Sequence, residues 1–309
     1  MFKAIKVNNM ILKIKNHAKQ LAFKSPFLIN LFLRRRFHVE LKLIAGNHKN
    51  NNLHPSIIHF SLNKAATQYT KKILRECVIE NGMVPVHISE YAFNTKFPYL
   101  TSSKADKMVN FSHIFKPKGY FYSAFGGFVQ GISEMDKYKV ILMVRDPRDI
   151  LVSWYYSIAF SHSIPPPTSN RHEEYIRKRQ NAQEITIDDH VISESDRVFN
   201  ILNHYQTELL DLYPDVYLTS YEKMTSNFEV WLKGLLDACE LEISSQTFRK
   251  LVEDNKELQP KEENIYKNIR KGKPGDYLDK LQPETIEYLN NKFSPILDTY
   301  HNVLNIADS

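Results

Sequence analysis

The chain has 309 residues, of which 42% are hydrophobic and 25% are charged, and its formal net charge at pH 7 is +6. This composition is ordinary for a soluble globular protein, and the length is sufficient for a sizeable core. The two cysteines, Cys77 and Cys239, have no metal-ligand spacing, which argues against a disulfide framework and suits a reducing compartment.

The positive charge is concentrated in residues 1–38, which hold nine lysines and arginines and no acidic residue. Of the 41 basic residues of the chain, these nine leave 32 against 35 acidic residues in 39–309, a net charge of −3. We therefore expect a basic N-terminal arm, 1–38, and a single domain, 39–309, without a uniformly basic surface for nucleic acid. The arm is expected either to be a solvated basic helix or to lie along an anionic membrane face or a partner.

The arm lacks the pattern of a secretory signal or a membrane span. Its longest apolar run, PFLINLFL, has eight residues, includes Asn30 and is followed by Arg34-Arg35-Arg36 rather than by a cleavage site. A bilayer span needs about 20 apolar residues. We expect a cytoplasmic protein whose membrane contact, where it occurs, is peripheral and made by residues 1–38.

Downstream of the arm, strand-like and helix-like stretches alternate. The predicted strands are 56–62, 83–88, 119–125, 138–144 and 215–222. The predicted helices are 66–79, Asp149 to about Phe160, 195–212, 226–239, 245–255 and 284–297. Ser226 and Glu229 read as a capping box, and three prolines make 160–174 a loop. The alternation predicts an α/β fold, a parallel β-sheet flanked by helices, with ligand loops after the strands.

The first candidate binding motif is NKAATQY, 63–69, between a predicted strand and a predicted helix. A phosphate at a helix N-terminus is held by unpaired backbone N–H groups and by the helix dipole. Lys64 adds a point charge, and the small Ala65 and Ala66 let the backbone come close. The pattern differs from the nucleoside-triphosphatase loop, which is a glycine-rich sequence ending in Lys-Ser or Lys-Thr.

Two further motifs carry cations beside loops. In RDPRDILVS, Arg145 follows the apolar run 138–144, and Ser153 lies eight residues later, close enough for both to face one anion. The alternative is that Arg145 caps its own strand by pairing with Asp146 or Asp149. In RKGKPGDY, Arg270 and Lys271 precede two glycines, which suits a cationic loop that wraps an anion.

These motifs, in this order, resemble those of the sulfotransferases that use 3′-phosphoadenosine-5′-phosphosulfate (PAPS). Residues 63–69 match a P-K-S-G-T-T-W loop without its glycine, Arg145 to Ser153 match R-[DN]-P-[RK]-D-x-x-x-S, and 270–277 match R-K-G-x-x-G-D-W with tyrosine for tryptophan. YEKM, 221–224, is similar to the family's Y-E-D-M stretch. The resemblance covers about residues 55–300 and implies a P-loop-like sulfotransferase fold.

The resemblance also implies roles for individual residues. The 5′-phosphosulfate would be held by the first loop, namely by Lys64, Ala65, Ala66, Thr67, Gln68 and Tyr69. The 3′-phosphate would be held by Arg145, Ser153, Arg270, Lys271 and Gly272. Tyr221 would lie near the adenine. Lys64 is expected to neutralise charge on the leaving phosphate, and neither the family chemistry nor the spacing of carboxylates and histidines calls for a metal.

The general base remains open among three residues. The cytosolic branch of the family has a histidine in a K-T-H stretch, where this chain reads Tyr-Ser-Ala-Phe at 122–125. Glycan sulfotransferases use a glutamate some two dozen residues after the loop lysine, and Glu90 stands 26 residues after Lys64. His87 lies beside it, and His113 is a further candidate.

Three functions remain in competition. The first is a sulfotransferase acting on an unidentified hydroxyl or amine, with a glycan or small molecule suggested by the polar segment 160–192. The second is a catalytically inactive, membrane-associated binding module with the same fold. The third is a P-loop kinase, although neither its phosphate loop nor a magnesium carboxylate is apparent.

Overall fold

A parallel sheet of five strands forms the centre of the computed structural model, which describes residues 25–102, 111–255, 262–266 and 270–304. The strands are β1 (Ile57–Ser61), β2 (Val84–Val86), β3 (Tyr120–Phe125), β4 (Lys139–Val144) and β5 (Tyr217–Ser220). Their order across the sheet is β2-β3-β1-β4-β5, and each pairs with its neighbours in parallel. The predicted α/β class with a parallel sheet is therefore confirmed.

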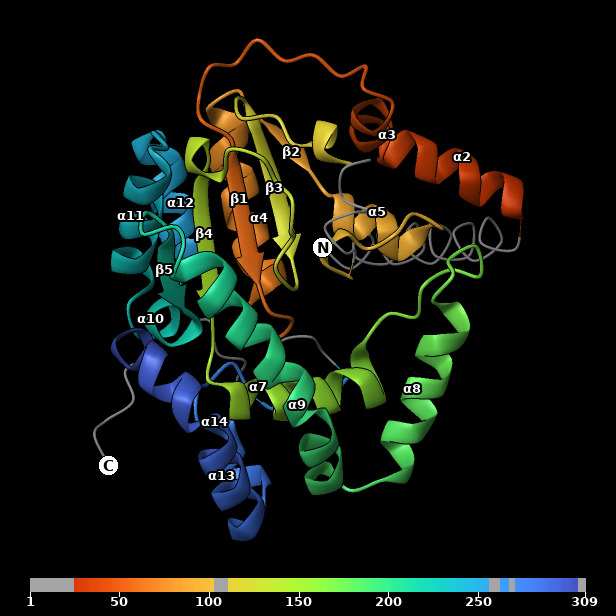
Figure 1. The fold of residues 1–309 in the computed structure, drawn as a ribbon, viewed down its shortest axis with the longest axis vertical. Coiled ribbons are helices and arrows are strands. Elements are labelled where there is room, and N and C mark those ends of the chain that lie inside the picture. The colour runs from red at the N-terminus through yellow and green to blue at the C-terminus, as the bar shows by residue number, and fades with distance from the viewer. Residues whose placement is uncertain (1–24, 103–110, 256–261, 267–269, 305–309) are drawn as a thin grey trace, which may run out of the picture.

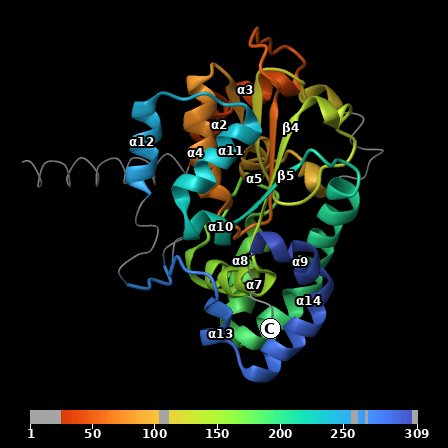
Figure 2. The ribbon, with the colours of Figure 1, turned by 90° about the vertical axis from the view of Figure 1, so that its left-hand side faces the viewer.

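Helices cover both faces of this sheet (Figures 1 and 2). The helices are α2 (Pro26–Arg36), α3 (His38–Ile44), α4 (Thr67–Glu80), α5 (Ile88–Asn94), α7 (Pro147–Tyr156), α8 (His172–Glu184), α9 (Ile187–Tyr205), α10 (Tyr221–Ser226), α11 (Phe228–Cys239), α12 (Ser245–Asp254), α13 (Asp276–Lys280) and α14 (Pro283–Leu304). One buried cluster joins the sheet to α4, α11 and α12, and another joins its opposite face to α9 and α14. No helix in the described residues is both long enough and apolar enough to cross a membrane.

The central strand β1 explains how the two cores form. All five of its residues are buried, and Ile57 packs into the cluster on the α4 side while Ile58 and Phe60 pack into the cluster on the α9 side. Alternation of side chains along a strand requires this division. The strand therefore packs against helices on both faces, and its C-terminal end leads directly into the loop that precedes α4.

The segment after β5 differs from its prediction. The strand ends at Ser220, and Tyr221 and Glu222 belong to α10 instead of to a strand reaching 222. The hydroxyl of Ser220 accepts a hydrogen bond from the amide of Lys223, which starts the helix early. The predicted capping box at Ser226 and Glu229 is also wrong, because Asn227 is the N-cap of α11 and accepts from the amide of Val230.

The region between β4 and β5 contains more helix than predicted. α7 begins at Pro147, since Asp146 is its N-cap and accepts from the amide of Arg148. A π-helical turn, Ser157–Ser161, ends it. α8 begins at His172, at the end of the predicted loop 160–174, and continues through residues for which no element was predicted. α9 begins at Ile187 rather than at 195 because Thr186 caps it. Polar residues dominate α8, so hydrophobic periodicity gave little signal there.

The last part of the predicted arm packs onto the body. Ile29, Leu33 and Phe37, on or just after α2, are buried together against Tyr91 of α5. The rings of Phe37 and Tyr91 meet edge to face with centroids 5.4 Å apart. The first part of the arm, 1–24, lies outside the described residues.

Candidate functional site

The loop before α4 adopts a left-handed conformation without glycine. Lys64 has φ of 78° and Ala66 has φ of 57°, and Ala66 is the N-cap residue of α4. Glycine adopts such angles without steric cost, whereas residues with a Cβ do so at a cost of about 1–2 kcal/mol. Ala66 therefore keeps the backbone shape that the family's glycine would give, at some expense in stability.

This shape presents backbone donors at the start of α4. Among the described residues, the amides of Ala66, Thr67 and Gln68 donate to no acceptor, while the hydroxyl of Thr67 donates to the carbonyl of Leu62 at 3.0 Å. Unpaired amides at the first turn of a 14-residue helix form an anion site together with the helix dipole. The glycine-free loop therefore offers backbone donors to an anion, and a phosphate bound there remains a prediction.

Ala66→Gly is expected to raise the free energy of unfolding by about 0.5–1 kcal/mol, because relief of the left-handed strain exceeds the greater backbone entropy of glycine. The matched control is Ala65→Gly, since Ala65 is fully buried and has no positive φ, so this change should destabilise the fold. Urea denaturation followed by circular dichroism measures both. A loss of stability in Ala66→Gly equal to that in the control would contradict the strain at this position.

Lys64 stands in a field of positive charge. Burial lowers the pKa of its amine to about 8, and the charges of Arg145 and Arg270 add to that effect. The first, second and third motifs thus act on one another electrostatically in the folded chain. Three cations close together favour an anion among them.

Arg145, at the C-terminal end of β4, is almost completely buried. Its guanidinium donates to the carbonyl of Lys64 at 3.1 Å, pairs with Asp149 at 3.3 Å and lies 4.2 Å from the ring centroid of Tyr221. Its Nε is buried and has no hydrogen-bond partner among the described residues. The pairing with Asp149 expected of a structural arginine is present, and the contact with Lys64 ties the second motif to the first loop.

Asp149 joins the second motif to the third. Its carboxylate, fully buried, accepts hydrogen bonds from the amides of Gly275 at 2.8 Å and Tyr277 at 3.1 Å, in addition to pairing with Arg145. Gly275 has φ of 79°, which lets its amide face this carboxylate. A single side chain therefore holds two segments that are 126 residues apart in sequence.

The cations of the third motif are ion-paired within their own loop. Arg270 contacts Glu263 and Asp276, and its guanidinium lies 4.2 Å from the ring centroid of Tyr156 on α7. Lys271 pairs with Asp276 at 3.0 Å and with Asp279 at 2.5 Å. Gly272 makes the turn after them with φ of 73°.

The remaining predicted nucleotide residues lie around these motifs. Ser153 is half-buried near the end of α7. Tyr69 is half-buried on α4, and its hydroxyl contacts the side chain of Asn255 while its ring meets that of Phe228 edge to face. Their roles toward a nucleotide remain predictions.

A second polar cluster lies at the carboxyl ends of β2 and β3, and it contains two predicted bases. Glu90, in the first turn of α5, pairs with Lys71 of α4 at 2.7 Å and with Arg36 of α2. His87, just after β2, lies with Nδ1 3.3 Å from the hydroxyl of Ser123 on β3. Carboxyl ends of parallel strands meet at one edge of a sheet, so this cluster shares that edge with the loop carrying Lys64.

The two predicted bases differ in their protonation. Burial alone would raise the pKa of Glu90, but Lys71 and Arg36 outweigh it and lower that pKa. Burial lowers the pKa of His87 to about 4, and the charge of Lys71 acts in the same direction. At neutral pH, Glu90 is therefore an ion-paired carboxylate, and His87 is a neutral imidazole.

The third predicted base, His113, lies elsewhere. Its Nε2 is 2.9 Å from the carbonyl of Ile44 at the end of α3, and no described contact joins it to the loop at 63–69. The structure thus groups His87 with Glu90 and separates His113 from them.

His162 is a residue that sequence reasoning treated only as part of a polar loop. It follows the π-helical turn after α7, and its ring packs against those of Trp154, Phe93 and Tyr175 with centroids 5.0–6.0 Å apart. Burial lowers its pKa, and the charge of Lys64 contributes, so it too lies near the first loop. No spacing in the sequence signals this, because α8 and the π-helical turn bring these rings together.

Glu222 was visible in the YEKM match but received no role. Its Oε1 accepts from the amide of Asp146 at 3.1 Å, and burial raises its pKa to about 7 against the opposing charge of Arg145. This hydrogen bond connects the residue that follows β5 to the turn between β4 and α7.

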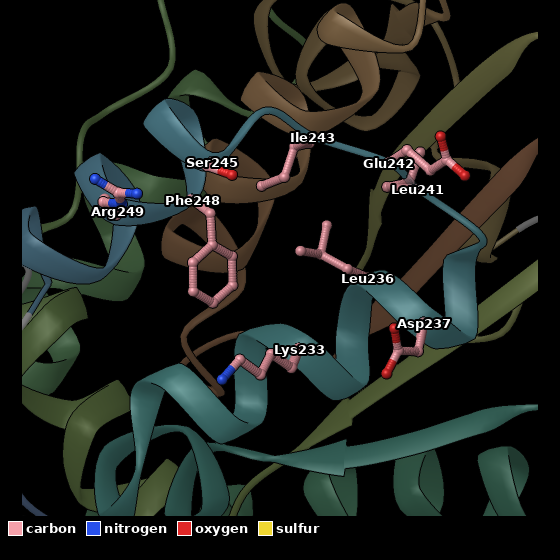
Figure 3. Close-up of a pocket in the computed structure, with 9 residues that line it drawn as sticks. All are labelled: Lys233, Leu236, Asp237, Leu241, Glu242, Ile243, Ser245, Phe248 and Arg249. Atoms are coloured by element: carbon pink, nitrogen blue, oxygen red, sulfur yellow. The ribbon is translucent and has the colours of Figure 1, made fainter.

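A surface pocket between α11 and α12 lies apart from these motifs (Figure 3). Its lining residues are Lys233, Leu236, Asp237, Leu241, Glu242, Ile243, Ser245, Phe248 and Arg249. None of the predicted catalytic or nucleotide-binding residues is among them. In the described part of the chain, no group of three or more His, Cys, Asp or Glu side chains is arranged to hold a metal ion.

Similarity to a known family covers the second and third motifs, whereas the first motif, 63–69, lies outside the matched residues. The family model described as "Sulfotransferase domain" matches residues 129–301, which include the second and third motifs. No curated protein matches the chain. Among solved structures, mouse sulfotransferase SULT7A1 complexed with PAP is similar at 15% identity over 83% of this chain and 89% of that chain, with a TM-score of 0.46. Retinol dehydratase in a complex with retinol and PAP is similar at 14% identity over 83% and 84% of the two chains, with a TM-score of 0.44.

Proposed function

Because the chain belongs to the sulfotransferase domain family, we propose that it moves a sulfuryl group from PAPS to a hydroxyl or amine of an acceptor. The other product is 3′,5′-adenosine bisphosphate (PAP). A glycan or a polar small molecule is the acceptor class that best suits the segment 160–192. Cysteine usage favours the cytoplasm as the site of this activity.

The observation that carries this proposal is the convergence of three sequence segments on Lys64. The free amides of α4 offer a phosphate site, Arg145 contacts the carbonyl of Lys64, and the charges of Arg145 and Arg270 act on its amine. Asp149 fixes the third segment to the second. A doubly phosphorylated nucleotide such as PAP has the charge to satisfy cations at both ends of such a site.

In the proposed reaction, the acceptor atom attacks the sulfur in line with the bond to the 5′-phosphate oxygen, and that bond breaks. The proton of the acceptor goes to a base of the protein, and the negative charge goes to the leaving phosphate. Lys64 neutralises this charge, while the amides of Thr67 and Gln68 hold the phosphate oxygens. The scheme places protein cations where other phosphate enzymes use a metal ion.

The 3′-phosphate is assigned to Arg145, Ser153, Arg270, Lys271 and Gly272. The buried Nε of Arg145 has no partner among the described residues, and Arg270 and Lys271 hold carboxylates of their own loop. A phosphate would share the remaining N–H groups of these cations with the carboxylates. Tyr221, stacked on Arg145, is assigned to the neighbourhood of the adenine.

A non-catalytic binding module is the second candidate. It is favoured by the double ion pair of Glu90, which weakens that carboxylate as a base. It is also favoured by the lack of a histidine in the stretch 122–125, which resembles the position of the K-T-H stretch of the cytosolic branch. Such a module would bind PAP but transfer no sulfate.

The proposed function is tested by two measurements on the same protein. Calorimetric titration should show PAP binding more tightly than 5′-adenosine monophosphate, which lacks the 3′-phosphate. Label from PAPS should pass to a member of a pooled acceptor set. Equal affinity for the two nucleotides would overturn the nucleotide site, whereas PAP binding without any transfer would favour the module.

Lys64→Ala should lower turnover about 100- to 1000-fold, since one lost transition-state donor costs about 2.7–4 kcal/mol. PAP binding should weaken much less. The control is Lys72→Ala, an exposed cation on α4, the helix that follows the loop of Lys64, and it should leave both values near wild type. Because the pKa of Lys64 is lowered to about 8 and a bound anion raises it, PAP affinity should fall as pH rises above about 8, and it should change little between about pH 7 and 8, where the phosphates of PAP are already ionised. Unchanged turnover in Lys64→Ala would remove this lysine from the mechanism.

A further inference from the structure

Helix α2 has two apolar faces, and the described residues cover only one of them. Ile29, Leu33 and Phe37 pack against Tyr91. On the other side four large apolar side chains are exposed, at 73% for Phe27, 43% for Leu28, 57% for Leu31 and 49% for Phe32. Their spacing of one, three and four residues places them on one continuous stripe of the helix. We name these four residues the α2 stripe.

The α2 stripe ends in a cluster of positive charge. Arg34, Arg35 and Arg36 occupy the last turn of the helix and are exposed. Arg35 continues the stripe one turn beyond Leu31, while Arg34 and Arg36 lie along its two borders. Arg36 pairs with Glu90, but Arg34 and Arg35 have no acidic partner in the described part of the chain. Preceding α2, residues 1–24 add six lysines and no acid.

We propose that the α2 stripe, with Arg34 and Arg35, is a docking surface for an anionic lipid bilayer, with the helix lying in the plane of the interface. Phenylalanine and leucine side chains enter the boundary between headgroups and acyl chains, and the arginines reach the lipid phosphates. The absence of acid from the whole of 1–38 fits an anionic surface better than a mixed-charge protein surface.

Docking through α2 has a consequence for the site. α2 contacts α5 through the pair of Arg36 with Glu90 and the packing of Phe37 on Tyr91, and Figure 1 shows the two helices side by side at the β2 edge of the sheet. α5 also carries the cluster of Glu90 and His87. A bilayer beneath α2 would therefore face the edge of the molecule where the two predicted bases lie.

The test is co-sedimentation of the full chain with vesicles of phosphatidylcholine, alone or mixed with phosphatidylserine. The triple variant Phe27→Ser/Leu31→Ser/Phe32→Ser should reduce partitioning onto the mixed vesicles by roughly 10- to 100-fold, since three half-exposed apolar side chains no longer enter the interface. Arg34→Gln/Arg35→Gln should cost roughly tenfold on mixed vesicles at low salt and little on neutral ones. The control is Leu212→Ser/Val230→Ser, which removes exposed apolar side chains on other elements.

Four outcomes are informative. Reduced binding in the two α2 variants, with the control at wild-type level and thermal unfolding unchanged, supports the docking surface. Equal vesicle binding by the triple variant and the wild type overturns it. It is also overturned if deletion of residues 1–24 abolishes vesicle binding while the triple variant still binds. A wild-type dimer in gel filtration that becomes monomeric in the triple variant, with vesicle binding unaffected, would assign the stripe to a second copy instead. Because PAP binding is measured separately, a failure here leaves the proposed function standing.

Discussion

Asp149→Ala is expected to destabilise the folded protein by about 3–5 kcal/mol, the range for removing one partner of a buried ion pair. The carboxylate of Asp149 is fully buried and receives three donors, from Arg145 and from the amides of Gly275 and Tyr277. Without it, the buried guanidinium of Arg145 loses its ion-pair partner and two amides lose their acceptor. The third motif also loses two of its hydrogen bonds to α7, so PAP affinity should fall along with stability.

Urea denaturation measures the first effect, and calorimetry with PAP on the folded fraction measures the second. Asp136→Ala is the control, since Asp136 is exposed, and it should change stability by less than about 0.5 kcal/mol. In the double variant Arg145→Ala/Asp149→Ala the losses should be less than additive, because the unpaired charge is removed as well. A change below about 1 kcal/mol in Asp149→Ala would contradict its bridging role.

His87→Asn is expected to lower the rate of sulfate transfer by roughly 10²- to 10⁴-fold, the contribution of a positioned general base. His87 is a neutral imidazole at neutral pH, because burial lowers its pKa to about 4. Glu90→Gln is expected to cost less than about tenfold, because both carboxylate oxygens of Glu90 already receive cations, from Arg36 and Lys71. Rates are compared at saturating donor and acceptor.

The pH dependence of the wild-type rate provides an independent check. A base with a pKa of about 4 is protonated, and so inactive, only as pH falls toward 4. Lys64 loses its charge as pH rises through about 8 in the free protein. At saturating donor the rate should therefore be nearly constant above about pH 5 and decline as pH falls toward 4, whereas at low donor concentration it should also decline above about pH 8.

His204→Asn, at an exposed position on α9, controls for the substitution itself. A larger loss in Glu90→Gln than in His87→Asn would reverse the order of the two residues. Near-normal rates in both would exclude this segment as the source of the base, and His162, a half-buried imidazole whose pKa is lowered by burial and by the charge of Lys64, would be the next residue to examine.

The sequence by itself determined the class of fold and the family. Largely apolar runs such as 138–144 predict strands that are buried on both faces. Such strands are typical of a parallel sheet that helices cover on both sides. The second and third motifs are recognisable because the residues of each lie close together in the sequence. Arg145 and Ser153 are eight residues apart, and Arg270 and Gly275 are five residues apart. Helix boundaries were less predictable wherever two capping residues compete, as Ser226 and Asn227 do before α11.

Only the tertiary structure decided how the site is assembled, because its decisive contacts join residues that are distant in the chain. Asp149 reaches Gly275 across 126 residues, and Glu90 pairs with Arg36 across 54. The left-handed φ of Ala66 likewise contradicts the local preference of alanine. A residue holds such an angle when the surrounding structure over-determines it, and at Ala66 the fixed end of β1 and the start of α4 provide that constraint.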